Sequence, residues 1–207
     1  MTVLATLWGA RTRSVHQGSH PAAPPLAADL SPRLLTSPLL AMLYLSPPLF
    51  RHLAGKGVRV VTSNAGAIGE LQGSDAEVIV IGGTYRAQSH SFVGPLALLA
   101  LQRIYASRCF IGVDGISLKC GLTTPSLEEA EIARTMIEHT QGEVVIIADH
   151  TKVGAVADCV TAPLDRVDTI VVDSGLDAGY RVDLESQGIQ IVLAEVQQSD
   201  DVSRPPG

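Results

Sequence analysis

Polar residues and glycines follow several short apolar segments of the chain, at the points where those segments end. They are Thr62, Ser63 and Asn64, then Gly82, Gly83, Tyr85 and Arg86, then Asp114 and Gly115, then Asp149, His150, Thr151 and Lys152. Carboxylates and amides bind hydroxyl groups, whereas lysine and backbone N–H groups bind phosphate. The set therefore predicts a site for a phosphorylated, polyhydroxylated small molecule.

Several of these residues also suit purely structural roles. The Gly82-Gly83 pair is compatible with an ordinary turn, and the Asp114 side chain is of a type that caps a turn through its own backbone. Lys152 also suits an exposed surface position. His150 has no second histidine at the spacing of a metal site, so we predict neither a metal nor a cofactor.

A helix is predicted to begin at Thr124-Pro125-Ser126, because proline suits the first helical turn. Ser126 and Glu129 have the spacing of a capping box, in which each side chain bonds the other's backbone N–H. This structural role accounts for Glu129, and Glu128 is predicted to be solvated.

Six apolar, β-branched segments alternate with four segments of helical character. The predicted strands are 58–62, 77–83, 108–113, 143–149, 169–173 and 189–195, and the predicted helices are 65–71, 94–106, 126–140 and 178–187. Strands that are apolar throughout are buried on both faces. Their alternation with helices predicts an α/β fold with a mostly parallel sheet flanked by helices.

The composition narrows the class of protein. With 15 basic and 21 acidic residues, the net charge of −6 provides no field that would attract nucleic acid. The three cysteines have no C-x-x-C spacing, which is typical of buried thiols in a reducing compartment. We expect no secretory signal, because residues 1–10 have no positive charge before their apolar run. We expect no membrane span, because the longest apolar run, 37–50, is short and interrupted by prolines. The predicted location is the cytoplasm.

The first 54 residues are rich in proline, serine and arginine and have one acidic residue, Asp29. They show no sustained helical or strand periodicity, so we predict an irregular segment with a helical turn or two around 39–44. An organellar transit peptide is the alternative. No Walker loop, G-x-G-x-x-G or G-x-S-x-G motif occurs, so the usual signatures of ATPases, dehydrogenases and α/β-hydrolases are absent.

Seven motifs occur together in a recognisable order. They are VVTSN, VIVIGGTYR, FVGPLALLAL, FIGVDGI, GLTTPSLEEAEIARTMI, VIIADHTKVG and DTIVVD, within residues 56–196. This order resembles the C-terminal sensor domain of DeoR-type bacterial transcriptional repressors. The resemblance predicts a sensor domain at 55–197 and a flexible tail at 198–207.

The resemblance implies a fold similar to that of phosphosugar isomerases and CoA transferases, and binding of a sugar phosphate that controls an attached winged helix. It places Asp114 and Gly115 in the effector site and Lys152 on its phosphate side. Thr62, Ser63 and Asn64 would form another wall, with backbone room at Gly82 and Gly83. A homo-oligomer and no catalytic residue are expected.

The chain departs from the family pattern at its beginning. No helix-turn-helix is recognisable, so we expect no direct DNA contact. Residues 19–54 hold no glycine, so the usual Asp-x-Gly-Thr-Thr loop has no counterpart. We predict a truncated or mis-framed beginning and a missing first strand, which would expose a sheet edge that the apolar run 39–45 partly covers.

Two other functions fit the sequence. An isomerase or deaminase on the same scaffold would use Asp114, Glu128 or Glu129, and Lys152 for acid–base chemistry. A degenerate fragment would neither bind nor catalyse. We favour the non-catalytic sensor, because the set of motifs follows the repressors.

Overall fold

The computed structural model describes residues 40–44 and 59–194, and it contains one large sheet and two small ones. The large sheet has seven strands in the order β12-β11-β9-β6-β1-β2-β3. They are β1 (Leu40–Tyr44), β2 (Arg59–Thr62), β3 (Glu77–Val80), β6 (Ala106–Gly112), β9 (Thr140–Ile147), β11 (Thr169–Asp173) and β12 (Gln190–Ala194). Every neighbouring pair is parallel, so the predicted α/β class with a parallel sheet is confirmed.

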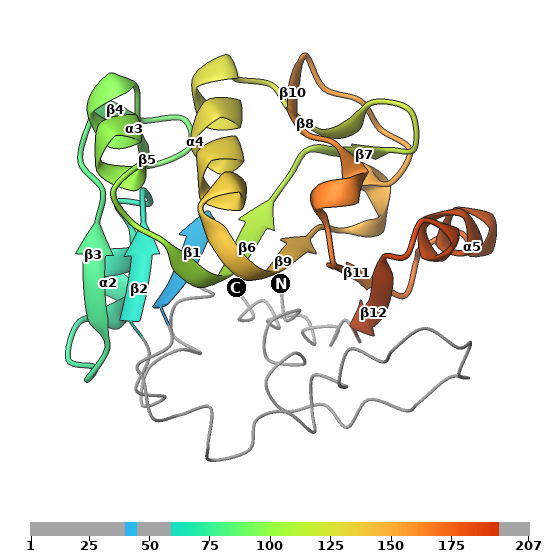
Figure 1. Ribbon diagram of the computed structural model, residues 1–207, viewed down its shortest axis with the longest axis horizontal. Helices are drawn as coiled ribbons and strands as arrows, with labels where there is room; N and C mark the ends of the chain where they lie inside the picture. Colours follow the sequence, from blue (N-terminus) through green and yellow to red (C-terminus); the bar gives the residue numbers. More distant parts are fainter. Residues whose placement is uncertain (1–39, 45–58, 195–207) are drawn as a thin grey trace, which may run out of the picture.

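The strand β1 corrects two predictions. Helical turns were expected around 39–44, but Leu40–Tyr44 forms a strand that pairs with β2 on one side and β6 on the other. The expectation of a missing first strand with an uncovered sheet edge is therefore wrong: β1 lies inside the sheet (Figure 1). Apolar residues alone did not distinguish a short strand from a helical turn. The remaining predictions for 1–39, 45–58 and 195–207 lie outside the described residues.

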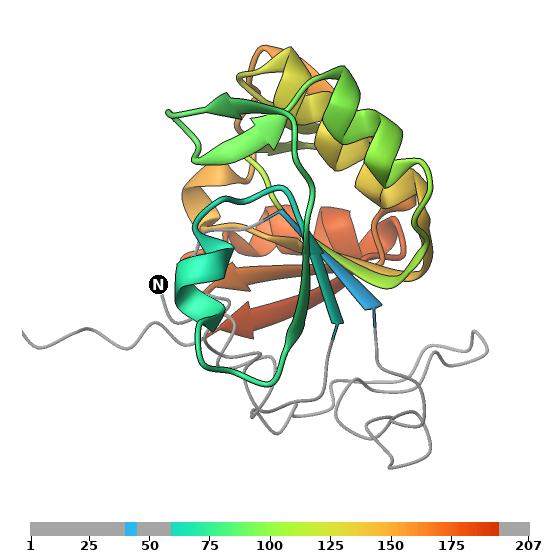
Figure 2. The same cartoon turned by 90° about the vertical axis from the view of Figure 1, so that its left-hand side faces the viewer.

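Within the described residues, four α-helices connect the strands. They are α2 (Ala67–Leu71), α3 (Pro95–Leu101), α4 (Leu127–Glu138) and α5 (Ala178–Ser186). Helices α3 and α4 lie side by side on one face of the large sheet, and α2 lies on the opposite side (Figure 2). The predicted helix at 94–106 ends earlier, at Leu101, because β6 already begins at Ala106.

Two small antiparallel sheets were not predicted. One joins β4 (Thr84–Arg86) to β5 (Ser91–Val93), and the other has the order β10-β8-β7, with β7 (Gly115–Ser117), β8 (Gly121–Thr124) and β10 (Cys159–Ala162). Strands of three or four residues are too short to show a periodicity. These small sheets extend the connections that leave the carboxyl ends of β3 and β6, which is where the candidate site residues lie.

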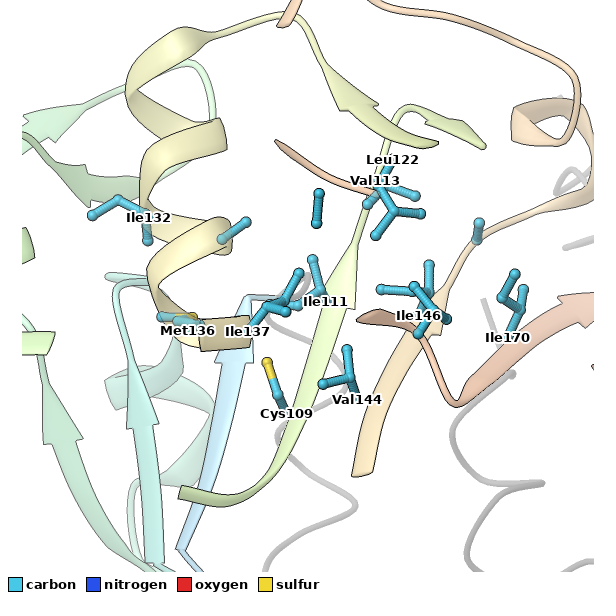
Figure 3. Packing of buried hydrophobic residues seen from close by; sticks show 14 of the residues in the cluster. Cys109, Ile111, Val113, Leu122, Ile132, Met136, Ile137, Val144, Ile146 and Ile170 are labelled. Carbon is cyan, nitrogen blue, oxygen red and sulfur yellow. The ribbon is translucent and has the colours of Figure 1, made fainter. Parts of the chain in front are cut away.

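Helix α4 packs on the centre of the large sheet. Its buried residues Ile132, Met136 and Ile137 belong to the same core as Ile111 of β6 and Ile146 of β9. Figure 3 shows Ile111 and Ile137 next to each other. The side chain of Ser126 caps the helix by accepting a hydrogen bond from the Glu129 backbone N–H at 3.4 Å. The predicted helix start is confirmed.

Cys109 lies in the middle of this core and is fully buried, whereas Cys120 and Cys159 are half-buried. Burial raises the pKa of the Cys109 thiol to about 12, against an opposing hydrogen bond with Thr140. The expectation of buried thiols therefore holds for one of the three cysteines.

We predict that a disulfide reagent modifies at most two thiols in the native protein, because only a thiolate exposed to solvent reacts readily. The third thiol reacts only after denaturant is added. Quantitative titration with a chromogenic disulfide on the wild type and on Cys109→Ala tests this assignment. Rapid native modification of all three thiols would contradict it.

In the part of the chain that the structure describes, no helix combines the length and the apolar composition needed to cross a membrane.

Candidate functional site

The order of the strands reverses at the centre of the large sheet. The chain runs from β1 through β2 to β3 on one side, and from β6 through β9 and β11 to β12 on the other. In open parallel sheets, ligands bind beyond the carboxyl ends of the strands at such a reversal. Asp114 follows the carboxyl end of β6, and Thr62 ends β2. The topology therefore places these two predicted residues at the expected edge of the sheet.

The structure brings two of the candidate residues, Asp114 and Lys152, together. The Lys152 Nζ is 3.9 Å from the Asp114 Oδ1, with side chains 36% and 47% exposed. The other carboxylate oxygen of Asp114 accepts a hydrogen bond from the Thr124 hydroxyl at 2.9 Å. The Asp114 carboxylate is thus held at one oxygen by Thr124, and it faces a cation and solvent with the other.

The loop that carries Lys152 is fixed at both ends. His150–Lys152 form a 3-10 turn, and the Asp149 side chain caps it by accepting a hydrogen bond from the Thr151 backbone N–H at 2.9 Å. The Thr151 hydroxyl donates to the same carboxylate oxygen. Past the turn, the Gly154 N–H donates to the Ile116 carbonyl at 2.8 Å. These bonds hold the Lys152 backbone beside the Asp114-Gly115 turn.

The loop that carries Lys152 lies so close to the Asp114-Gly115 turn that position 115 has no room for a side chain. An added Cβ at Gly115 would lie 2.6 Å from the Ala155 carbonyl oxygen and would also meet the Thr123 hydroxyl. That hydroxyl accepts a hydrogen bond from the Ala157 N–H at 2.9 Å. Gly115 therefore lets three backbone segments come together beside Asp114.

Thr62, Ser63 and Asn64 are all buried at the end of β2. The Thr62 hydroxyl accepts a hydrogen bond from the Asn64 N–H at 3.0 Å, and the Asn64 side chain accepts one from the Gly66 N–H at 2.8 Å. Thr62 and Asn64 thus shape the turn after the strand. The Ser63 hydroxyl, unlike that of Thr62, is buried and has no hydrogen-bond partner among the described residues, although buried hydroxyls usually have one.

Arg86 forms an ion pair with Glu129, at 3.6 Å between Nε and Oε1. The prediction that capping alone accounts for Glu129 is therefore incomplete: its backbone is capped, but its buried carboxylate faces Arg86. The prediction that Glu128 is solvated is confirmed. The spacing in the sequence does not show that Arg86, on the β4–β5 hairpin, pairs with Glu129, which lies 43 positions later on helix α4.

Gly82 and Gly83 follow β3 and lead into the β4–β5 hairpin. A Cβ on Gly83 would lie 2.6 Å from the Val93 carbonyl oxygen, whereas nothing lies within 4 Å of one on Gly82. Gly83 therefore serves the close approach of the hairpin, which is the turn role that the sequence left open.

Asp173, which was not among the candidate residues, is buried at the carboxyl end of β11. Its Oδ1 is 2.7 Å from the Nδ1 of His150, and its Oδ2 accepts a hydrogen bond from the His150 backbone N–H at 2.8 Å. The signal was present, because Asp173 ends an apolar strand as Asp114 follows one. Within the described residues, no group of three or more His, Cys, Asp or Glu side chains is arranged to hold a metal ion.

The pKa of Asp173 is lowered from its ordinary value of 3.8. Burial acts to raise this pKa, but hydrogen bonds from the backbone N–H groups of His150 and Gly175 and from the His150 ring outweigh it. The Asp173 carboxylate is therefore ionised and stabilises the fold in the neutral range.

A depressed pKa in the folded state gives stability that is present above the unfolded pKa and lost as the pH falls through the folded one. We therefore predict that Asp173→Asn lowers the free energy of unfolding most above pH ~5, since the unfolded pKa is ~3.9. The difference from the wild type shrinks below that value. Urea unfolding between pH 7 and pH 3 measures it, and a difference that does not change with pH would refute the assignment.

Comparison with known proteins bears on this arrangement. The family model described as the DeoR C terminal sensor domain matches residues 47–174. The chain belongs to this family. The match includes the candidate site from Thr62 to Lys152 and ends one residue after Asp173.

Curated relatives of this DeoR-family chain are named as transcriptional regulators. The HTH-type transcriptional regulator GlpR of Haloferax volcanii is 35% identical over 59% of this chain and 48% of its own length. The HTH-type transcriptional regulator IolR of Bacillus subtilis is 31% identical over 67% and 55%. A putative aga operon transcriptional repressor of Escherichia coli O157:H7 is 32% identical over 59% and 45%. The chain thus spans about half the length of the curated relatives it matches.

Among solved structures, eIF2B beta from Chaetomium thermophilum resembles the DeoR-family chain with a TM-score of 0.40 at 15% identity, over 66% of this chain and 44% of that one. This likeness is too weak to bear on function.

Proposed function

We propose that residues 55–197 are an effector-sensing domain that binds a phosphorylated sugar or a related metabolite, and that this binding controls the DNA affinity of a winged-helix domain in the regulator. One observation carries the proposal. Lys152 and Asp114 face each other across 3.9 Å at the sheet edge where strand order reverses, in a chain of the DeoR sensor family.

The two charges suit the two parts of such a ligand. An ammonium group binds phosphate as a compact point charge, and a carboxylate accepts hydrogen bonds from sugar hydroxyls. At 3.9 Å, with both side chains partly exposed, the Lys152–Asp114 pair contributes little to stability. The ligand can therefore replace this contact at small cost. The buried Ser63 hydroxyl, directly after β2, would supply a further donor.

The remaining predicted residues have weaker support as ligand contacts. Arg86 is paired with Glu129, and Gly83 is needed for packing against Val93. We retain Thr62, Asn64, Gly82, Gly83 and Arg86 as part of the proposed site, at its periphery. The proposal is centred on Ser63, Asp114, Gly115 and Lys152.

Thermal unfolding of the full chain tests the proposal, with ribose 5-phosphate, glucosamine 6-phosphate and their unphosphorylated sugars as ligands. A ligand at a hundred times its Kd adds about 2.7 kcal/mol to the free energy of unfolding. We expect the midpoint to rise with at least one sugar phosphate and with neither free sugar. No rise with any of them would contradict phosphosugar sensing and favour a fragment that does not bind.

A turnover assay separates sensing from the isomerase alternative. We expect no conversion of ribose 5-phosphate and no ammonia release from glucosamine 6-phosphate. A rate that Asp114→Asn abolishes would show an enzyme and overturn the sensor proposal.

We further propose that the protein acts in the cytoplasm, because a regulator of transcription works where the DNA is. We also propose that it is a homo-oligomer, because such regulators bind as symmetric assemblies. Light scattering coupled to gel filtration tests the oligomer, and a monomer at all concentrations would contradict it.

A further inference from the structure

The Asp173 carboxylate is the acceptor of three hydrogen bonds, and two of them come from His150. They are the backbone N–H of His150 at 2.8 Å, its ring Nδ1 at 2.7 Å, and the Gly175 N–H at 2.8 Å. An ionised carboxylate can only accept, so the ring nitrogen that faces it carries the proton. Asp173 thus fixes both the backbone of His150 and the orientation of its ring.

The contact between His150 and Asp173 holds the turn that carries Lys152. His150 is the first residue of the 3-10 turn that ends with Lys152, and its carbonyl accepts a hydrogen bond from the Val153 N–H at 3.1 Å. Strands β9 and β11 are parallel neighbours, so Asp173 holds this turn from the adjacent strand. The other end of the loop is held by the Gly154–Ile116 bond. Lys152 lies between the two anchors.

Gly175 makes the contact sterically possible. A Cβ at Gly175 would lie 2.6 Å from the His150 Nδ1 and 2.7 Å from the Cγ of the same ring. The imidazole therefore packs against the backbone at Gly175, with its Nδ1 facing Asp173. A side chain at this position would displace the ring without altering either partner of the pair.

We propose that Asp173 and His150 are positioning residues, which hold the Lys152 turn so that the ammonium group meets the anionic group of the effector. The role for Lys152 rests on the proposed function. The half-exposed ring of His150 serves this purpose through its Nδ1, which faces Asp173, and its Nε2 is not a ligand contact. A direct contact of Nε2 with phosphate is the competing explanation.

Two conservative substitutions separate these explanations. The side-chain amide of asparagine can donate from about the place of Nδ1, whereas that of glutamine reaches about as far as Nε2. His150→Asn therefore keeps the bond to Asp173 and loses Nε2, and His150→Gln does the reverse. Asp168→Asn is the matched control for Asp173→Asn, because Asp168 precedes the other end of β11, where it accepts a bond from the Val144 N–H at 2.8 Å.

The first measurement needs no ligand: amide hydrogen exchange of the full chain, followed at residues 150–153. An amide hydrogen exchanges when its segment opens locally. If a variant lacks one hydrogen bond to a charged group, this opening becomes about tenfold more frequent. We expect exchange about tenfold faster in His150→Ala, Asp173→Asn and Gly175→Ala. His150→Asn and Asp168→Asn should exchange like the wild type. Equal protection in His150→Ala and the wild type would overturn the positioning role.

The second measurement is calorimetric titration of the same variants with ribose 5-phosphate and glucosamine 6-phosphate. We expect about tenfold weaker binding in His150→Ala, the size of one lost hydrogen bond to a charged group, with rescue by His150→Asn. Rescue by His150→Gln and not by His150→Asn would overturn the proposal and assign a direct contact. If the wild type binds neither compound, the proposed function fails, and hydrogen exchange still decides whether the pair holds the turn.

Discussion

Replacing Ile146 by alanine is expected to lower the free energy of unfolding by about 2–5 kcal/mol, the usual range for such a truncation in a core. Ile146 is fully buried in β9, between strands β6 and β11. The core around it is closely packed, so its neighbours can fill the space left behind only in part. Chemical denaturation at neutral pH measures the loss.

Leu99→Ala is the matched control, because Leu99 lies on α3 with 58% of its surface exposed. We expect a change within about 0.5 kcal/mol at such a surface position. Equal losses in the two variants would contradict the assignment of the core to the face of the sheet beneath α4.

Gly115→Ala is expected to destabilise the protein by about 1–3 kcal/mol, the range for overpacking, and also to weaken effector binding. The new methyl group would collide with the Ala155 carbonyl and the Thr123 hydroxyl. Relief of this collision requires movement of the loop that carries Lys152. Unfolding by denaturant measures the first effect, and titration with the sugar phosphate that stabilises the wild type measures the second.

Gly69→Ala provides the contrast, because Gly69 lies inside helix α2 and a Cβ there would meet nothing within 4 Å. Alanine is favoured over glycine in a helix by about 1 kcal/mol, so this variant should be slightly more stable than the wild type. If Gly115→Ala were as well tolerated as Gly69→Ala, the loop would not be packed against the turn.

The long strands and helices could be predicted from the sequence because their burial leaves a clear pattern. TIVVD is a strand at 169–173 as predicted, since all five residues are buried. The strand β1 could not be predicted in the same way, because five apolar residues among prolines fit a helical turn equally well. The pairing of β10 with β8 joins segments more than 30 residues apart, which no local pattern reveals.

The contacts in the candidate site could likewise be predicted from the sequence only in part. The closeness of Asp114 and Lys152 could be predicted, because both follow apolar strands, and parallel strands bring their carboxyl ends together. Arg86 was placed with them on the same reasoning, but the β4–β5 hairpin carries its side chain to Glu129. The His150–Asp173 pair depends on the neighbourhood of β9 and β11, which the order of the sheet sets and the sequence does not show.

Whether Lys152 binds the phosphate of an effector is tested by calorimetric titration of the wild type, Lys152→Met and Lys119→Met with ribose 5-phosphate and glucosamine 6-phosphate. Lys119 is the matched control, since it lies exposed in the turn between β7 and β8. We expect the wild type and Lys119→Met to bind one of the two with equal affinity, and Lys152→Met to bind it at least about tenfold more weakly. Equal affinity in all three proteins would show that the Asp114–Lys152 edge is not the effector site.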